Sequence, residues 1–224
     1  MITKEKEQTT LLLMQKEREQ ICTYSRKLIT SNLTTGTGGN ISIFNREKGL
    51  MAISPSSIPY FDLTPESIVI MDLEGNVVDG DNKPSVEFAM HAIFYSHRQD
   101  VNAVVHTHSN ACSVMAALHW DLPAANYLVA MGGGPTIPCS KYATYATKEL
   151  AHAALEAMGK GYAAFLANHG FISAYPTIDG AFGLADEIER CADIFLRAKS
   201  VGEPQIIPDE EIYAMLNAAS GYNK

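Results

Sequence analysis

The amino-acid sequence predicts a single α/β domain built around a mixed β-sheet. Segments with helix and strand patterns interleave along 224 residues without a composition break, a linker or an internal repeat. Two pairs of short apolar segments are joined by turn sequences, which argues against a purely parallel sheet. Apolar residues make up 46% of the chain, enough for a full hydrophobic core.

The N-terminal half predicts one helix followed by two hairpins. Apolar residues recur at helical spacing between charged residues over 8–30. A Gly-rich loop follows at 34–40, and short apolar segments then indicate strands separated by turns. The expected strands cover 41–44, 50–53, 68–71 and 76–78.

The C-terminal half alternates helices with apolar strands. Ser85 is a good N-cap and predicts a helix over 86–96. A strand expected at 103–108 begins with apolar residues and ends with polar ones, whereas 163–166 is apolar throughout. The remaining expectations are helices over 109–118, 147–158 and 177–199, a strand at 171–174, and a short final helix capped by Asp209.

The net negative charge of the chain argues against some classes of binding partner. The net charge of −8 argues against nucleic acid or an anionic membrane as a main partner, so local contacts would have to hold a substrate phosphate. The first residues are charged where a signal peptide is apolar, and no run of about 18 apolar residues occurs, so we expect a cytoplasmic protein. The four cysteines have no C-x-x-C spacing and are expected to be reduced thiols.

Three histidines suggest a metal site. His106 and His108 stand two residues apart at the end of one expected strand, so their side chains point to the same side. His169 ends a second expected strand, directly before a glycine. Three imidazoles with a fourth position open are typical of catalytic zinc, and Co²⁺ or Mn²⁺ fit the same ligands. A lone histidine in a strand is more often a core or surface residue, and spacing does not show that the strands converge.

Glu87 is the candidate acid/base. It lies in the first turn of the helix expected after Ser85, where the helix dipole alone favours a carboxylate. A carboxylate beside a metal-bound hydroxyketone could instead transfer a proton to or from carbon. His91 lies four residues further along the same helix face and could support Glu87. The other histidines are expected to be surface or hydrogen-bonded residues: His97, His119 and His152.

A Gly-rich loop and several hydroxyls form a candidate phosphate site. The loop at 35–40 offers backbone N–H groups and hydroxyls with little bulk, as anion-binding nests do. It is neither a dinucleotide fingerprint, because Ile41 replaces the third glycine, nor a Walker loop. Glycine clusters are mostly turns, so the loop alone is a weak signal. Further hydroxyls lie near expected strand or helix ends, at Ser54, Ser56, Ser57 and Ser85.

Five motifs occur in a fixed order along the chain. They are GTGGNIS at 36–42, ISPS at 53–56, PSVE at 84–87, VVHTH at 104–108 and NHG at 168–170. In this order they resemble the class II aldolase/adducin family, over about residues 8–218. Two further stretches are similar to the branch of the family that cleaves L-fuculose 1-phosphate: LPAANY at 122–127 and IPCSKYATY at 137–145.

The resemblance implies a three-layer αβα sandwich with a mixed, largely antiparallel sheet, assembled as a homotetramer with active sites between subunits. It implies one Zn²⁺ per subunit on His106, His108 and His169, with Glu87 near or on the metal. Glu87 would be the acid/base at the donor carbon. Tyr127, from a neighbouring subunit, would protonate or deprotonate the hydroxyl of the aldehyde half. Without the resemblance, Tyr127 is better interpreted as a core or interface aromatic. The residues that match phosphate-binding positions are Gly38, Asn40, Ser56, Ser57 and Ser85.

The chain departs from the family pattern at two positions near the phosphate. Val86 follows Ser85 where the family has a second serine, and Ser57 replaces a glycine at a close backbone approach. The resemblance also suggests Tyr222 as a mobile C-terminal tyrosine. Tyr145 is expected to form an aromatic wall, and the ends, about 1–7 and 219–224, are expected to be flexible.

The reaction implied by the resemblance is cleavage of an L-ketose 1-phosphate to dihydroxyacetone phosphate and L-lactaldehyde. Tyr127 or water would take the C4 hydroxyl proton, the C3–C4 bond would break, and Glu87 would protonate C3. No lysine lies in these motifs to form a Schiff base. A sugar-phosphate epimerase, dehydratase or decarboxylase would use the same metal ligands. An adducin-like module would use the fold without catalysis, but such a module needs no metal ligands.

Overall fold

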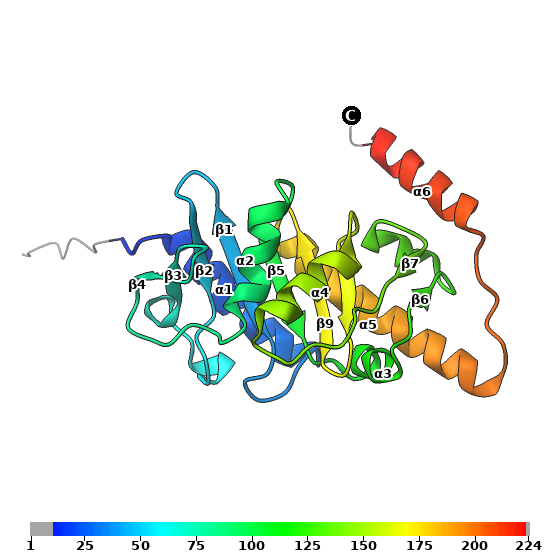
Figure 1. Ribbon diagram of the computed structural model, residues 1–224, viewed down its shortest axis with the longest axis horizontal. Coiled ribbons are helices and arrows are strands. Elements are labelled where there is room, and N and C mark those ends of the chain that lie inside the picture. Colours follow the sequence, from blue (N-terminus) through cyan, green and yellow to red (C-terminus); the bar gives the residue numbers. More distant parts are fainter. Residues whose placement is uncertain (1–10, 223–224) are drawn as a thin grey trace, which may run out of the picture.

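The computed structural model describes residues 11–222, and its centre is a seven-stranded sheet (Figure 1). The strand order is β4-β3-β2-β1-β5-β9-β8, and every neighbouring pair is antiparallel. The predicted hairpins are present as β1–β2 and β3–β4. The strands are β1 (Asn40–Asn45), β2 (Leu50–Ile53), β3 (Val69–Met71), β4 (Val77–Asp79), β5 (Ala103–Thr107), β8 (Ala163–Leu166) and β9 (Gly170–Tyr175).

Helices cover both faces of this sheet and make the three predicted layers (Figure 1). The predicted α/β fold class is therefore confirmed, although the main sheet is antiparallel throughout and not mixed, because β1, β5 and β9 also pair in antiparallel fashion. One face is covered by α1 (Gln15–Thr30), α3 (Asn110–Leu118) and α5 (Ile178–Val201), the other by α2 (Phe88–His97) and α4 (Lys148–Met158). A final helix, α6 (Asp209–Tyr222), follows α5 after an extended segment and lies at one end of the molecule (Figure 1).

Alternation along the strands explains the two hydrophobic cores. On β8, Ala163 and Phe165 pack toward the layer of α1, α3 and α5, while Ala164 and Leu166 pack toward α4. A strand buried on both faces has no polar side, which is why 163–166 is apolar throughout. His106 follows the same rule on β5: its neighbour Val105 belongs to the α5 side, so His106 points to the side of α2 and α4.

Several short elements are absent from the predictions. They carry too few residues for a periodic signal, and their turns depend on local proline and hydroxyl contacts. They are the 3₁₀ turns η1 (Tyr60–Asp62), η2 (Pro65–Ser67) and η3 (Tyr127–Gly132), and a two-stranded sheet of β6 (Leu122–Pro123) and β7 (Thr136–Ile137).

Two helices begin more than one residue later than predicted. In the described part, α1 begins at Gln15. Met14, which precedes it, has a left-handed φ of 57°, so the α-helical conformation does not extend to residues before Gln15. Glu87 is the N-cap of α2 and not a residue of its first turn, because a turn from Ser85 to Phe88 comes first. Residues 1–7 and 223–224 of the predicted flexible ends lie outside the described residues, and the backbone of 219–222 belongs to α6. Among the helices described, none is long and apolar enough to cross a membrane.

Candidate metal centre and active site

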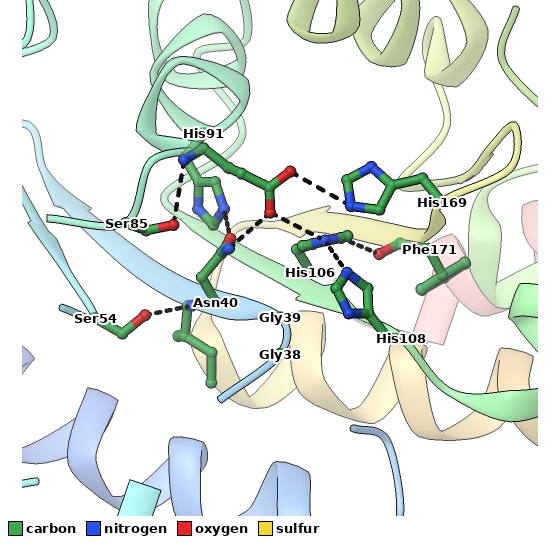
Figure 2. Close-up of polar contacts among 12 residues, drawn as sticks. Gly38, Gly39, Asn40, Ser54, Ser85, His91, His106, His108, His169 and Phe171 are labelled. Atoms are coloured by element: carbon green, nitrogen blue, oxygen red, sulfur yellow. Dashed lines mark hydrogen bonds and ion pairs between the residues drawn. The ribbon is translucent and has the colours of Figure 1, made fainter. Parts of the chain in front are cut away.

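The four predicted metal ligands converge at one edge of the sheet (Figure 2). His106 lies on β5, and His108 directly follows that strand. His169 lies in the turn between β8 and β9, and Glu87 reaches the same point from the N-cap of α2. One ligand atom from each of Glu87, His106, His108 and His169 lies within 4.8 Å of the others.

Two glycines allow the backbone to come this close. A Cβ on Gly39, which has a φ of +70°, would lie 2.5 Å from the carbonyl oxygen of His106. A Cβ on Gly170 would lie 2.4 Å from the carbonyl oxygen of Thr107 and 3.0 Å from the His108 ring. The glycines of the GTGGNIS and NHG motifs therefore permit the convergence of β1, β5 and β9.

The hydrogen bonds of His106 show that the site suits a cation. Its Nδ1 lies 2.8 Å from the carbonyl oxygen of Phe171, which can only accept, so Nδ1 carries a proton, and Nε2 is the nitrogen that can offer a lone pair to a metal. This Nε2 lies 2.9 Å from His108 Nε2 and 3.3 Å from Glu87 Oε2. Ligand atoms around tetrahedral zinc are about 3.3 Å apart. Electron-rich atoms at such distances repel unless a cation or proton lies among them.

The second carboxylate oxygen of Glu87, Oε1, has no hydrogen-bond partner. Glu87 Oε1 is buried without a hydrogen bond and lies 3.4 Å from His169 Nε2. A buried carboxylate oxygen is costly unless it is paired or coordinates a metal. The donor set of three imidazoles and one carboxylate thus fits a divalent metal, and zinc is among the ions it would accept.

The environment keeps the ligands in the forms that bind metal. Burial, followed by the charges of neighbouring histidines, lowers the pKa of His108 to about 3. Burial and the charge of His106 lower the pKa of His169 to about 4. Burial alone would raise the pKa of Glu87, but His106, His169 and a hydrogen bond from Asn40 outweigh it and hold that pKa well below its usual range. At neutral pH His108 and His169 are therefore uncharged and Glu87 is ionised.

The predicted phosphate residues lie together beside the metal ligands. Gly38, Asn40, Ser56, Ser57 and Ser85 all line one cavity of about 140 Å³, which also reaches Glu87 and His108. Ser57 has a left-handed φ of 64°, the conformation for which the family's glycine is suited. Ser54 is different: its hydroxyl accepts the backbone N–H of Ile41 and fixes the loop.

A second, larger cavity lies on the other side of the metal ligands. It encloses about 370 Å³, and Val86, Glu87 and His108 line both cavities. Tyr145 forms part of its wall, as the sequence suggested, and Tyr142 stands beside it. Tyr142 and Thr144 were not given a role from the sequence, because nothing in their spacing indicates that the segment before α4 turns toward the metal ligands. Asn168 belongs to the NHG motif but was not given a role of its own.

Tyr127 is not part of this cluster within one chain. It begins η3, is 58% exposed, and lines a separate apolar cavity with Tyr162, Tyr175 and residues of α6. Its side chain is thus available to a neighbouring molecule and not to the metal ligands of its own chain. Tyr222 ends α6, and its side chain lies outside the described part of the structure.

The chain is similar to sugar-phosphate aldolases along most of its length. Residues 19–196 match the family model described as Class II Aldolase and Adducin N-terminal domain. Over 213 residues the chain is 50% identical to the 5-deoxy-D-ribulose 1-phosphate aldolase of Bacillus thuringiensis serovar kurstaki, an alignment that covers 95% of this chain and 100% of the relative.

Other relatives carry two kinds of name. The 5-methylthioribulose-1-phosphate/5-deoxyribulose-1-phosphate aldolase of Rhodospirillum rubrum is 39% identical over 88% of each chain. The L-fuculose phosphate aldolase of Escherichia coli K12 is 37% identical over 85% of this chain and 87% of its own length. A solved structure of an L-fuculose 1-phosphate aldolase superimposes with a TM-score of 0.91 at 42% identity and covers 94% of this chain and 99% of its own.

Proposed function

The chain belongs to the class II aldolase and adducin family, and we propose that it cleaves a deoxy-ketose 1-phosphate to dihydroxyacetone phosphate and a short aldehyde ending in a methyl group. The first candidate is 5-deoxy-D-ribulose 1-phosphate, which would give acetaldehyde, because the relative at 50% identity carries that substrate in its name. L-Fuculose 1-phosphate, which would give L-lactaldehyde, is the second candidate, because the structure with a TM-score of 0.91 carries that name.

The lining of the larger cavity is the observation that carries this proposal. Beyond the metal ligands, none of the described residues that line it is charged: Val86, Tyr142, Ala143, Thr144, Tyr145 and Asn168. Such a wall suits the methyl end of an aldehyde and offers no positively charged side chain to a second phosphate or a carboxylate. The single phosphate would then lie in the smaller cavity, among the hydroxyls of Ser56, Ser57 and Ser85.

Val86 would lie along the carbon chain between the two ends. Its side chain is 56% exposed and lines both cavities. The position that the family fills with a second serine is thus apolar in this chain. Phosphate binding would therefore depend on the remaining hydroxyls and on backbone N–H groups of the Gly-rich loop.

The reaction follows from the positions of Glu87 and Tyr127. When bound at the four ligands, Zn²⁺ would supply Lewis-acid stabilisation for the negative charge that develops on the donor fragment. Glu87, which is ionised in the resting site, would take up a proton from solvent and deliver it to C3 after the C3–C4 bond breaks. Tyr127 would take the proton of the C4 hydroxyl and pass it to solvent. Since Tyr127 does not line the metal cavity of its own chain, this role requires an oligomer with sites between subunits, which we propose is a homotetramer.

Product analysis with both sugars tests the proposal. Zinc-loaded protein is mixed with 5-deoxy-D-ribulose 1-phosphate or L-fuculose 1-phosphate, with and without a chelator, and dihydroxyacetone phosphate is measured by reduction with a coupled dehydrogenase. Chelator-sensitive release that is faster from the deoxyribulose phosphate supports the first candidate, and faster release from the fuculose phosphate supports the second. Release from neither sugar contradicts the proposal, and NMR of the products would then detect epimerisation, dehydration or decarboxylation.

A further inference from the structure

A column of buried polar side chains runs from the metal site into the core between β1 and α2. Figure 2 shows its first part, at Asn40 and His91. Asn40 Nδ2 donates to Glu87 Oε2 at 3.0 Å, and Asn40 Oδ1 contacts His91 Nε2. His91 Nδ1 lies 2.7 Å from Ser42 Oγ, which lies 2.6 Å from the hydroxyl of Tyr95. Asn40 and Glu87 are 5% and 6% exposed, and the other three residues at most 1%.

The chemistry of the groups gives every hydrogen bond one direction. The amide nitrogen of Asn40 donates to the carboxylate oxygen Oε2 of Glu87, so the amide oxygen of Asn40 faces His91. That oxygen also only accepts, so His91 carries its proton on Nε2. Burial lowers the pKa of His91 to about 3, so the ring is neutral, and Nδ1 accepts from Ser42. Ser42 then accepts from Tyr95.

A flipped Asn40 amide would be unfavourable at both ends. Its oxygen would face the Glu87 carboxylate, and its NH₂ group would face the N–H of His91. We propose that His91 is a positioning residue, which locks the Asn40 amide so that its N–H holds Glu87 Oε2 and leaves Oε1 directed at the metal position. This inference rests on the proposed role of Glu87 as the acid that protonates the donor carbon.

The surroundings agree with a role in orientation. The column crosses the apolar layer between the sheet and α2, where the Tyr95 ring stacks on Phe44 at 5.0 Å. Polar groups in such a layer are costly unless each is bonded, and here the side chains of Asn40, His91, Ser42 and Tyr95 all have partners. Apolar side chains could fill the same space, but they could not distinguish the two ends of the Asn40 amide.

Two substitutions of His91 separate orientation from packing. His91→Leu fills much of the space without a donor, whereas His91→Gln keeps an N–H near the position of Nε2. We measure exchange of the C3 protons of dihydroxyacetone phosphate with deuterated solvent, together with zinc affinity by competition. His91→Leu should slow exchange about 10–100-fold with little change in KM, and His91→Gln should recover most of the rate. Equal rates for the two variants would overturn the proposal.

Nitrogen NMR of the wild-type protein tests the same column without relying on catalysis. In both zinc-free and zinc-loaded protein, His91 should show a protonated Nε2 and an unprotonated Nδ1, and Tyr95→Phe should leave the His91 tautomer unchanged. A protonated Nδ1 would reverse the direction of the column and overturn the inference even if exchange is fast. Wild-type protein that shows the expected tautomer but no exchange would instead contradict the proposed function.

Discussion

At the scale of single residues, His108 is the metal-site histidine most open to the cavities. It lines both of them, and burial with the neighbouring histidines keeps it neutral. We expect His108→Ala to remove a ligand and to lower metal content after dialysis to a small fraction of that of wild type. Elemental analysis measures this.

The matched control for this change is His152→Ala. His152 is an exposed residue of α4 and lines a cavity between α2 and α4 that none of the metal ligands lines. This variant should keep full metal content. A His108→Ala protein with the same zinc content as the control would contradict the three-histidine site.

Glu87 combines two functions at one position, as a neighbour of the metal and as the proposed acid. Glu87→Gln keeps the shape of the side chain and removes its charge and its transferable proton. We expect metal content to be largely kept and exchange at the donor carbon to fall about 10²–10⁴-fold. Glu156→Gln, which changes an exposed carboxylate on α4, is the control and should exchange like wild type. Comparable exchange in Glu87→Gln would remove Glu87 from the acid/base role.

At the scale of elements, the contact between the end of β5 and the start of β9 sets the position of the ligands. Gly170→Ala would place a methyl group against Thr107 and the His108 ring. We expect a loss of about 1–3 kcal/mol in the free energy of unfolding and weaker zinc binding. Urea unfolding and metal competition measure the two effects.

A second glycine provides the control for this prediction. Gly183 lies inside α5, and a Cβ there would meet no atom within 4 Å. Gly183→Ala should be neutral or stabilise the protein by up to about 1 kcal/mol. If both variants behave alike, the close approach at Gly170 does not position the site.

Arg18 connects α1 to the β3–β4 side of the sheet. Its side chain is 1% exposed and donates to the carbonyl oxygens of Leu13, Pro65 and Ile68, at 2.7, 2.9 and 2.6 Å, and to the Asp79 carboxylate. Arg18→Met leaves these acceptors without their donor. We expect a loss of about 3–5 kcal/mol in the free energy of unfolding.

Arg197 on α5 offers the comparison for Arg18. Its ion pair with Asp193 is exposed, with 80% of the arginine side chain accessible, so Arg197→Met should change stability by about 1 kcal/mol or less. Thermal and urea unfolding of both variants test the difference. A small effect at Arg18 would mean that the three carbonyl groups find other partners.

At the scale of the whole molecule, the separation of Tyr127 from Glu87 predicts complementation between subunits. Glu87→Gln and Tyr127→Phe proteins should each have little aldolase activity. After the two are unfolded together and refolded as a mixture, some sites should combine an intact Glu87 with an intact Tyr127 from another chain. We expect the mixture to recover activity that neither variant has when it is refolded alone. No recovery, although mixed oligomers form, would contradict the interfacial role of Tyr127.

Local pattern predicted most of the architecture. Helical spacing identified α1 and α5, and turn sequences between apolar segments identified the two hairpins. The main differences lie at helix boundaries, whose positions depend on local contacts. Glu87 is an N-cap and not a residue of the first helical turn, because a turn from Ser85 to Phe88 precedes α2. The short sheet of β6 and β7 left no signal, since two residues cannot establish an alternation.

The candidate site was predictable in its residues but not in its arrangement. His106 and His108 share one side because they lie two residues apart, a relation that the sequence contains. That His169 meets them depends on the pairing of β5 with β9, a contact between segments more than 60 residues apart. Asn40 and Ser42, two polar residues on one side of an otherwise apolar strand, were a signal of the buried column, but its partners His91 and Tyr95 could not be assigned.

The sequence by itself therefore determined the element types, the ligand types and the family, because these depend on composition, short spacings and ordered motifs. Only the tertiary structure decided which side chains meet: the convergence of the four ligands, the two cavities that share Val86, and the bonding of Asn40 to both Glu87 and His91. The reason is physical. Strand pairing and helix packing bring together residues that are distant along the chain, and hydrogen-bond direction is set only when those partners are in place.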